Sequence, residues 1–149
     1  MLFRSSDAMI DRIEENFRSR GFSLWAVEIP NVAPFIGFTG LAVPAFGAPF
    51  TPCVEIGWRL APEYWGRGYA TEAARTALTY AFGTLKMPEI VSFTSVFNLR
   101  SRAVMERLGM RRDPTDDFDH PSVREGHPLR PHVLYRLKAS GYGGTAFKR

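Results

Sequence analysis

Two glycines and a helix-forming run stand together in WGRGYATEAA, residues 65–74. The first turn of a helix leaves backbone N–H groups unpaired and carries partial positive charge, so it favours an anion such as phosphate. Gly66 and Gly68 would let the backbone wrap a pyrophosphate, and Arg67 would add charge. The alternative is a tight strand-to-helix turn without a ligand. The stretch is neither a Walker loop nor a G-x-G-x-x-G dinucleotide motif.

Other reactive side chains are few. Cys53 is the single cysteine, so no internal disulfide or cysteine-based zinc site can form, and we expect a reducing, cytoplasmic setting. The histidines are His120, His127 and His132, and their spacing matches no common metal motif. We therefore expect no metal.

The composition is that of one ordinary globular domain: 149 residues, 45% hydrophobic and 23% charged. The chain contains no signal-peptide core and no apolar run long enough to span a bilayer, so we expect no membrane segment. The net charge of +4 suits anionic ligands in general. The basic segment 100–112 has no aromatic residue to stack bases, so nucleic acid is not the expected partner.

The order of elements predicts one α/β domain over residues 1–138 and a flexible glycine-rich tail over 139–149. Hydrophobic periodicity predicts helices at 6–21, 71–82 and 99–109, and strands at 23–29, 35–43, 53–61, 89–96 and 132–137. The first two strands are expected to form a hairpin. Ser6 or Asp7 is expected to cap the first helix, and Gly57 to mark a bulge or close backbone approach in the third strand. Residues 111–131 read as a polar loop.

Two segments carry a resemblance to a known family. WRLAPEYWGRGYATEAA, residues 58–74, resembles the acyl-CoA-binding segment of the GNAT superfamily of N-acyltransferases, whose signature is Gln/Arg-x-x-Gly-x-Gly/Ala. Gly68 and Ala70 match this signature, but Trp65 stands where glutamine or arginine is usual. NLRSRAVMERLGM, residues 98–110, is similar to a helix of the branch that acts on ribosomal-protein N-termini. Its matching positions are Asn98, Ser101, Glu106, Arg107, Gly109 and Met110.

The resemblance covers roughly residues 1–138 and implies the acyl-CoA N-acyltransferase fold, a mixed, mostly antiparallel central sheet with flanking helices. The first strand and helix of that family have no counterpart in this sequence, so we expect an N-terminally shortened domain: either the start was misassigned or truncated, or the sheet lacks an edge strand. An unpaired sheet edge invites pairing with another chain. We therefore expect a homodimer through that edge.

The implied activity is direct transfer of an acetyl group from acetyl-CoA to the amine of a small molecule or protein N-terminus. The resemblance implies cofactor contacts at Trp58, Leu60, Trp65, Gly66, Arg67, Gly68, Tyr69, Ala70, Thr71 and Asn98. Contacts of Arg100 and Arg102 with the cofactor phosphates are a further hypothesis, although solvated helix arginines are commoner. Two rival functions are an acyl-CoA-sensing module without turnover and a nucleic-acid-binding protein.

The implied catalytic residues are Glu55 as base and Ser101 as acid. Glu55 could instead be a solvent-facing or ion-paired carboxylate, and the competing bases are Asp116, Asp117, Asp119 and His120. Many relatives place a tyrosine where Met105 stands, and methionine cannot donate a proton, which leaves Ser101; its hydroxyl could instead bond a backbone carbonyl. A covalent route through Cys53 is rejected, since no neighbouring histidine activates it in the sequence. Residues 124–137, with Glu125, His127, Arg130 and His132, are expected to border the acceptor; the alternative is a hairpin stabilised by ion pairs.

Overall fold

The computed structural model describes residues 2–143, with side chains from residue 6 onward. The longer helices are α1 (Leu2–Arg20), α2 (Tyr69–Gly83) and α3 (Leu99–Arg107). The strands are β1 (Leu24–Ile29), β2 (Ala33–Ala42), β3 (Glu55–Leu60), β4 (Glu89–Ser95), β5 (Arg111–Arg112), β6 (Phe118–Asp119) and β7 (Pro131–Lys138). Short 3₁₀ turns occupy Pro62–Tyr64, Pro114–Asp116 and Ala139–Gly141.

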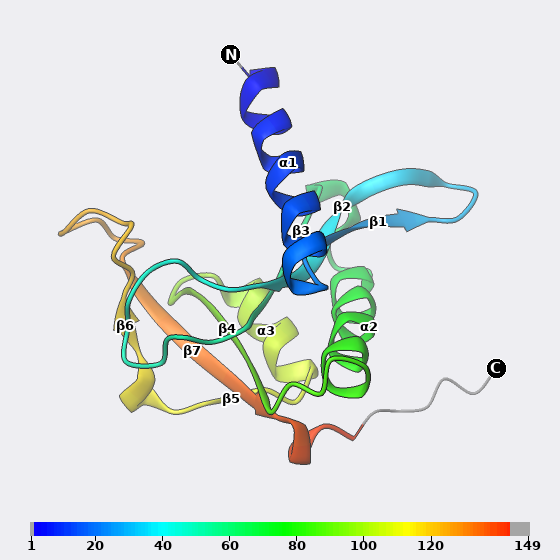
Figure 1. The fold of residues 1–149 in the computed structure, drawn as a ribbon. Helices are drawn as coiled ribbons and strands as arrows, with labels where there is room; N and C mark the ends of the chain where they lie inside the picture. Colours follow the sequence, from blue (N-terminus) through cyan, green and yellow to red (C-terminus); the bar gives the residue numbers. More distant parts are fainter. Residues whose placement is uncertain (1, 144–149) are drawn as a thin grey trace.

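All these strands join one sheet with the order β1-β2-β3-β4-β7-β5, and β6 also pairs with β7. Every pair is antiparallel except β3 and β4, which run parallel. The predicted hairpin of the first two strands is confirmed, as is the mixed, mostly antiparallel fold class. Figure 1 shows α2 and α3 beside the middle of this sheet.

The sheet opens between β3 and β4. These strands share one register pair, Glu55 with Val91. Beside it, the Ser92 hydroxyl donates to the Ile56 carbonyl at 2.8 Å, so a side chain satisfies a carbonyl that a closed ladder would use. On its other edge β3 pairs with β2 over its whole length without a register shift. The expected bulge at Gly57 is therefore wrong: the irregularity is a fork on the β4 side.

The core lies between the sheet and the pair α2 and α3. Ile56, Leu78, Ile90 and Met105 are at most 1% exposed there. The small residues Ala74, Ala77 and Ala81 on α2 are buried, which lets the helix lie close to the sheet as predicted. Burying one such large aliphatic side chain contributes roughly 1.5–3 kcal/mol, so this layer fixes the fork in place.

The first helix differs from the prediction. It begins at Leu2, several residues before the expected caps at Ser6 and Asp7, and ends as expected at Gly21, whose φ is +79°. Figure 1 shows α1 projecting away from the sheet. Its C-terminal end is held to the body, because the Tyr80 hydroxyl donates to the Gly21 carbonyl at 3.0 Å.

The segment predicted as a polar loop contains β5, a 3₁₀ turn and β6. Each strand has only two residues, which is too short for a hydrophobic period, and each is defined by its pairing with β7. After β7, Tyr142 packs on α2, its hydroxyl 2.7 Å from that of Thr79. Residues 144–149 lie outside the described range, and the domain boundary at residue 138 stays a prediction.

Candidate active site

A cavity of about 890 Å³ occupies the fork between β3 and β4. Its walls come from β3, the turn before α2, the first turn of α2, β4 and α3. Eleven of the twelve residues predicted as site residues line it: Glu55, Trp58, Leu60, Trp65, Gly66, Gly68, Tyr69, Ala70, Thr71, Asn98 and Ser101. The exception is Arg67, which is exposed and lies outside the lining.

The N-terminus of α2 forms one end of the cavity. Gly68 is the N-cap residue, with φ +82°, and no side chain caps the helix. Gly66 also has a positive φ, +72°. A Cβ at either position would meet no atom within 4 Å, so these glycines are needed for backbone conformation rather than for space. The uncapped first turn can therefore present its free N–H groups to an anion.

Trp65 and Arg100 face each other at the same end. The Arg100 guanidinium lies over the Trp65 ring, 4.7 Å from its centroid, and the Trp65 indole N–H donates to the Leu60 carbonyl at 2.8 Å. Such a cation–π contact is worth about 0.5–1 kcal/mol at an exposed site. The tryptophan that departs from the family signature thus holds an arginine from α3 at the cavity wall.

Glu55 lies at the narrow end of the fork. Its side chain is half-buried, and burial raises the pKa of its carboxyl from 4.5 to about 7. The cause is the lost hydration of the charged form. A carboxyl with a pKa near 7 can gain and lose a proton at neutral pH, which is what a general base requires.

Ser101 lies in the first turn of α3. Asn98 caps this helix, because its Oδ1 accepts from the Ser101 N–H at 3.2 Å while its amide donates to the Thr94 hydroxyl at 3.0 Å. Within residues 6–143 no hydrogen bond to the Ser101 hydroxyl is found, so the expected alternative of a bond to the preceding turn is not seen. Met105, one turn on, is 1% exposed and also lines the cavity.

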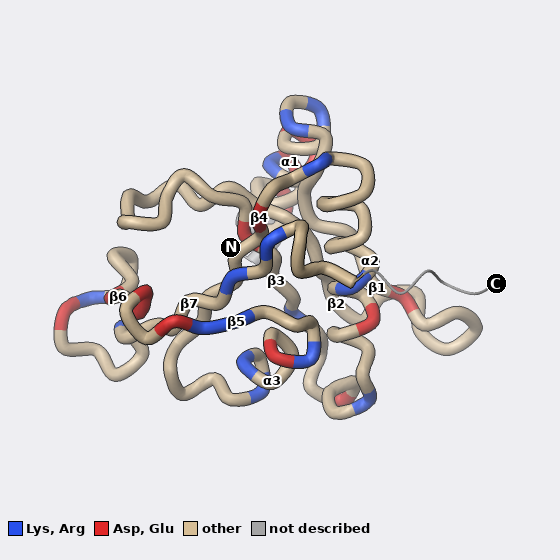
Figure 2. Tube along the Cα trace, turned by 90° about the horizontal axis from the view of Figure 1, so that it is seen from below, with Lys and Arg blue, Asp and Glu red and all other residues tan. Residues whose placement is uncertain are grey.

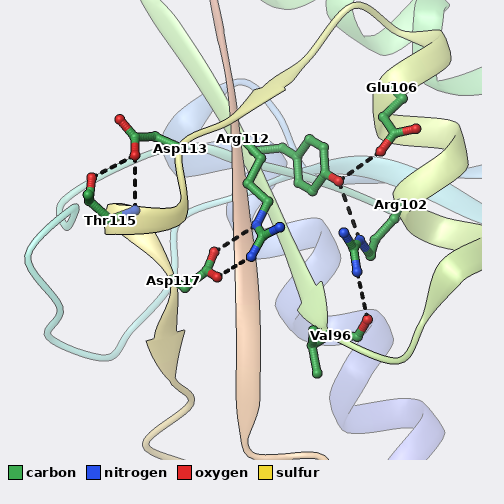
Figure 3. A network of polar contacts seen from close by, with 8 residues as sticks. Val96, Arg102, Glu106, Arg112, Asp113, Thr115 and Asp117 are labelled. Carbon is green, nitrogen blue, oxygen red and sulfur yellow. Dashed lines mark hydrogen bonds and ion pairs between the residues drawn. The ribbon is translucent and has the colours of Figure 1, made fainter.

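A polar network holds α3 against β7 (Figure 3). The Tyr135 hydroxyl donates to the Glu106 carboxylate at 3.0 Å and accepts from Arg102 Nε at 3.4 Å. Arg102 also donates to the Val96 carbonyl at 2.9 Å. Arg102 therefore serves the packing of α3, whereas Arg100 lines the cavity.

The remaining candidates are placed elsewhere. Cys53 precedes β3, and burial and the neighbouring Glu55 carboxylate raise the pKa of its thiol, which disfavours the thiolate that a covalent route needs. Asp116 and Asp117 are ion-paired to Arg136 and Arg112.

Within residues 6–143 no group of three His, Cys, Asp or Glu side chains is placed to hold a metal ion. In the same range no helix is both long and apolar enough to cross a membrane.

Several cavity residues were not predicted from the sequence, among them Ser92, Phe93 and Thr94 on β4. The available signal was the order of elements: a strand, a helix and a second strand place parallel neighbours side by side. What the order does not reveal is that these neighbours separate and expose side chains of β4 to the cavity.

Comparisons with known proteins identify the family. Residues 4–111 match the model of the acetyltransferase (GNAT) domain. The chain belongs to this family of acetyltransferases.

Individual relatives agree with that assignment. The chain is 38% identical over 100 residues to an FsC-acetyl coenzyme A-N(2)-transacetylase of Aspergillus fumigatus, covering 62% of this chain and 43% of the relative. It is 34% identical over 102 residues to the uncharacterised YkkB of Bacillus subtilis, covering 68% and 58%. The chain thus spans about half the length of these curated relatives.

Solved structures show the same fold. An acetyltransferase from Agrobacterium tumefaciens superposes with a TM-score of 0.67 at 30% identity, covering 90% of this chain and 71% of that one. Mycobacterium smegmatis RimJ, solved with CoA-disulfide, gives a TM-score of 0.75 at 21% identity, covering 92% and 62%. The second likeness concerns the fold alone.

Proposed function

We propose that this chain transfers an acetyl group from acetyl-CoA directly to the amine of a small molecule or a protein N-terminus. One observation carries the proposal: a single cavity joins the uncapped N-terminus of α2 to the half-buried carboxyl of Glu55. A cofactor with an anionic diphosphate and a long arm ending in a thioester has the chemistry to occupy both ends.

The residues that would hold acetyl-CoA fall into two groups. The backbone N–H groups from Trp65 to Thr71 would bind the diphosphate, with Arg100 adding positive charge. The β3 edge from Trp58 to Leu60 would hold the arm, because beyond Glu55 it has no register pair with β4. Asn98 would contribute indirectly, by capping the helix that carries Ser101.

The transfer itself needs three proton movements. Glu55 would take a proton from the substrate ammonium, so that the neutral nitrogen can form its bond to the thioester carbon. When the C–S bond breaks, the Ser101 hydroxyl would give a proton to the leaving thiolate. Ser101 would regain a proton from the positively charged nitrogen of the intermediate, which leaves a neutral amide. Each such transfer contributes typically 10²–10⁴-fold to a rate.

Calorimetry with CoA and an assay of free thiol release with a panel of amines test this function. We expect CoA binding and amine-dependent release, with kcat/KM rising with pH as Glu55 loses its proton near pH 7. Glu55→Gln and Ser101→Ala should each lower kcat by at least about 10²-fold. Binding without release would favour the acyl-CoA-sensing alternative, and absence of binding would overturn the proposal.

We also propose a homodimer formed through β1 and, from the single Cys53, a reducing cytoplasmic compartment. In the described chain β1 is the last strand of the sheet and pairs with β2 alone. An antiparallel contact between two β1 strands would be symmetric, as two-fold dimers require.

A further inference from the structure

Six aromatic rings gather on the sheet face away from α2 and α3. We call them the ring cluster: Phe46 and Phe50 of the loop between β2 and β3, Phe93 of β4, Phe118 of β6, and His120 and His132. Contacting ring centroids are 4.7 Å to 6.4 Å apart, within the range of attractive aromatic pairs. Every ring is half-buried, so each keeps some surface accessible to a ligand.

The ring cluster adjoins Glu55. Val91 is the register partner of Glu55, and registered neighbours in a sheet point to the same face. Phe93 lies two residues further along that face, about 7 Å from Val91 at the ordinary rise of a strand. Glu55 and Phe93 both line the cavity, so the proposed base and the first ring of the cluster share one space.

The space between Glu55 and Phe93 is open above Gly57. A Cβ built on Gly57 would meet within 4 Å only Oε1 of Glu55, at 3.9 Å. The carboxylate therefore borders a hollow that any other residue at position 57 would begin to fill. An amine whose nitrogen enters this hollow would place the rest of the acceptor toward Phe93.

Apart from Glu55, five carboxylates of this region are already engaged. Arginines bind four of them, and Asp113 accepts hydrogen bonds from the N–H and hydroxyl of Thr115. The pairs are Glu89 with Arg136 at 2.9 Å, Asp116 with Arg136 at 2.7 Å, Asp117 with Arg112, and Asp119 with Arg130 at 3.5 Å. Figure 2 shows the basic positions of β5 followed by acidic positions toward β6. A polycation would have to displace these arginines.

The two histidines add polar edges to the ring cluster. His120 Nδ1 accepts from the Ser122 N–H at 3.1 Å, so its neutral ring carries the proton on Nε2. His132 Nδ1 donates to the Arg130 carbonyl at 3.0 Å. Burial and the neighbouring His132 and Arg130 lower the pKa of His120 and favour its neutral form.

We propose that the acceptor is a monoamine carried on an aromatic group, and that the ring cluster holds this group while the nitrogen reaches the hollow over Gly57 beside Glu55. The inference rests on the proposed function and names the substrate class of the same site. Aromatic stacking would supply the selectivity, and the paired carboxylates would disfavour polyamines.

The test compares two amines that differ in whether the six-membered ring is aromatic, together with one polyamine. 2-Phenylethylamine and 2-cyclohexylethylamine have the same carbon count and an amine on the same two-carbon arm, and spermidine represents polycations. We expect kcat/KM for 2-phenylethylamine to exceed that for either of the others about tenfold, equivalent to about 1.4 kcal/mol. Equal values for the two matched amines, or a higher value for spermidine, would overturn the inference while leaving acetyl transfer intact.

Two matched variants test whether the preference for the aromatic amine arises at the ring cluster. Phe118→Leu removes a ring of the cluster, whereas Phe82→Leu makes the same change at a ring that stacks on Tyr142 beside α2. The ratio of kcat/KM for the two matched amines should fall toward one in the first variant and persist in the second. Because the ratio is taken within one variant, a general loss of stability cancels. A preference that survives Phe118→Leu would overturn the role of the cluster.

Binding separates this inference from the proposed function. If no amine is acetylated, NMR titration of the CoA-loaded protein still reports on the rings of His120 and His132. Shifts of their ring protons with 2-phenylethylamine but not with 2-cyclohexylethylamine would support the aromatic site even without turnover. Absence of any difference would reject it.

Discussion

At the scale of single residues, burial of Glu55 lowers folding stability at neutral pH and gives its carboxyl the pKa that a general base needs. Burial raises the pKa of its carboxyl from 4.5 to about 7, so the folded protein favours the protonated form. Between these two values the native chain holds a proton that the unfolded chain releases. Stability therefore falls as the pH rises through this window, and the cost is fully present above pH 7.

Glu55→Gln should relieve this cost. Glutamine is close in size and carries no charge, so we expect unfolding free energy to rise by about 3 kcal/mol at pH 8 and to change little at pH 4. Urea unfolding at the two pH values measures the difference. Glu63→Gln, at an exposed carboxylate in the turn before α2, is the matched control. A gain of equal size at both pH values would show that burial of charge is not its source.

Gly68→Ala should weaken both folding and CoA binding. The residue has φ +82°, and this conformation costs a side-chain-bearing residue roughly 1–2 kcal/mol. We expect that loss in unfolding free energy and a higher Kd for CoA by calorimetry. Gly83→Ala is the control, because Gly83 ends α2 without a positive φ and alanine is the better helix former there. If Gly68→Ala bound CoA unchanged, the diphosphate contact would not depend on this turn.

What the sequence predicts at this site depends on how local the signal is. Gly66, Gly68 and Ser101 belong to short motifs whose geometry is set by neighbouring residues, and they could be predicted. Phe93 lines the cavity because β3 and β4, which are distant in sequence, separate. No residue near Phe93 in the sequence indicates this separation. Two-residue strands such as β5 were missed for the same reason: pairing with β7 creates them.

At the scale of elements, α3 depends on a tyrosine outside the cavity. The Tyr135 hydroxyl joins Glu106 and Arg102, two residues on the helix that presents Ser101 and Arg100. Its ring is 3% exposed, so the hydroxyl cannot turn to water without moving the core. The position of α3 relative to the fork is therefore tied to one buried group.

Tyr135→Phe should weaken the attachment of α3 to β7. Loss of the hydroxyl leaves the half-buried Arg102 and the exposed Glu106 without this partner, at a cost of about 0.5–1.5 kcal/mol in unfolding free energy. We expect KM for acetyl-CoA to rise several-fold, because Arg100 and Ser101 move with α3. Tyr142→Phe is the control, since its hydroxyl bonds Thr79 and Arg75 on α2 instead. The same KM change in both variants would mean that the effect is not specific to α3.

At the scale of the whole molecule, one end of the sheet is open. β1 is the terminal strand within the described residues. Figure 1 shows α1 projecting away from the body of the molecule, and its residue Ile10 is 52% exposed. A groove of about 690 Å³ lies between β1, β2 and α2, lined in part by Phe17, Trp25 and Tyr80. An unpaired edge next to apolar surface is the combination that a second copy can cover.

Pairing of β1 with its copy predicts a concentration-dependent dimer in analytical ultracentrifugation. Ala26 is an exposed residue of β1, so Ala26→Lys would bring two like charges together across a two-fold contact and should shift the chain toward monomer, more strongly at low salt. Ala139→Lys makes the same change at an exposed residue directly after β7, which β2, β3 and β4 separate from β1 in the sheet, and should leave the equilibrium unchanged. A folded monomer at all concentrations would reject the dimer, and an equal response of both variants would place the contact away from β1.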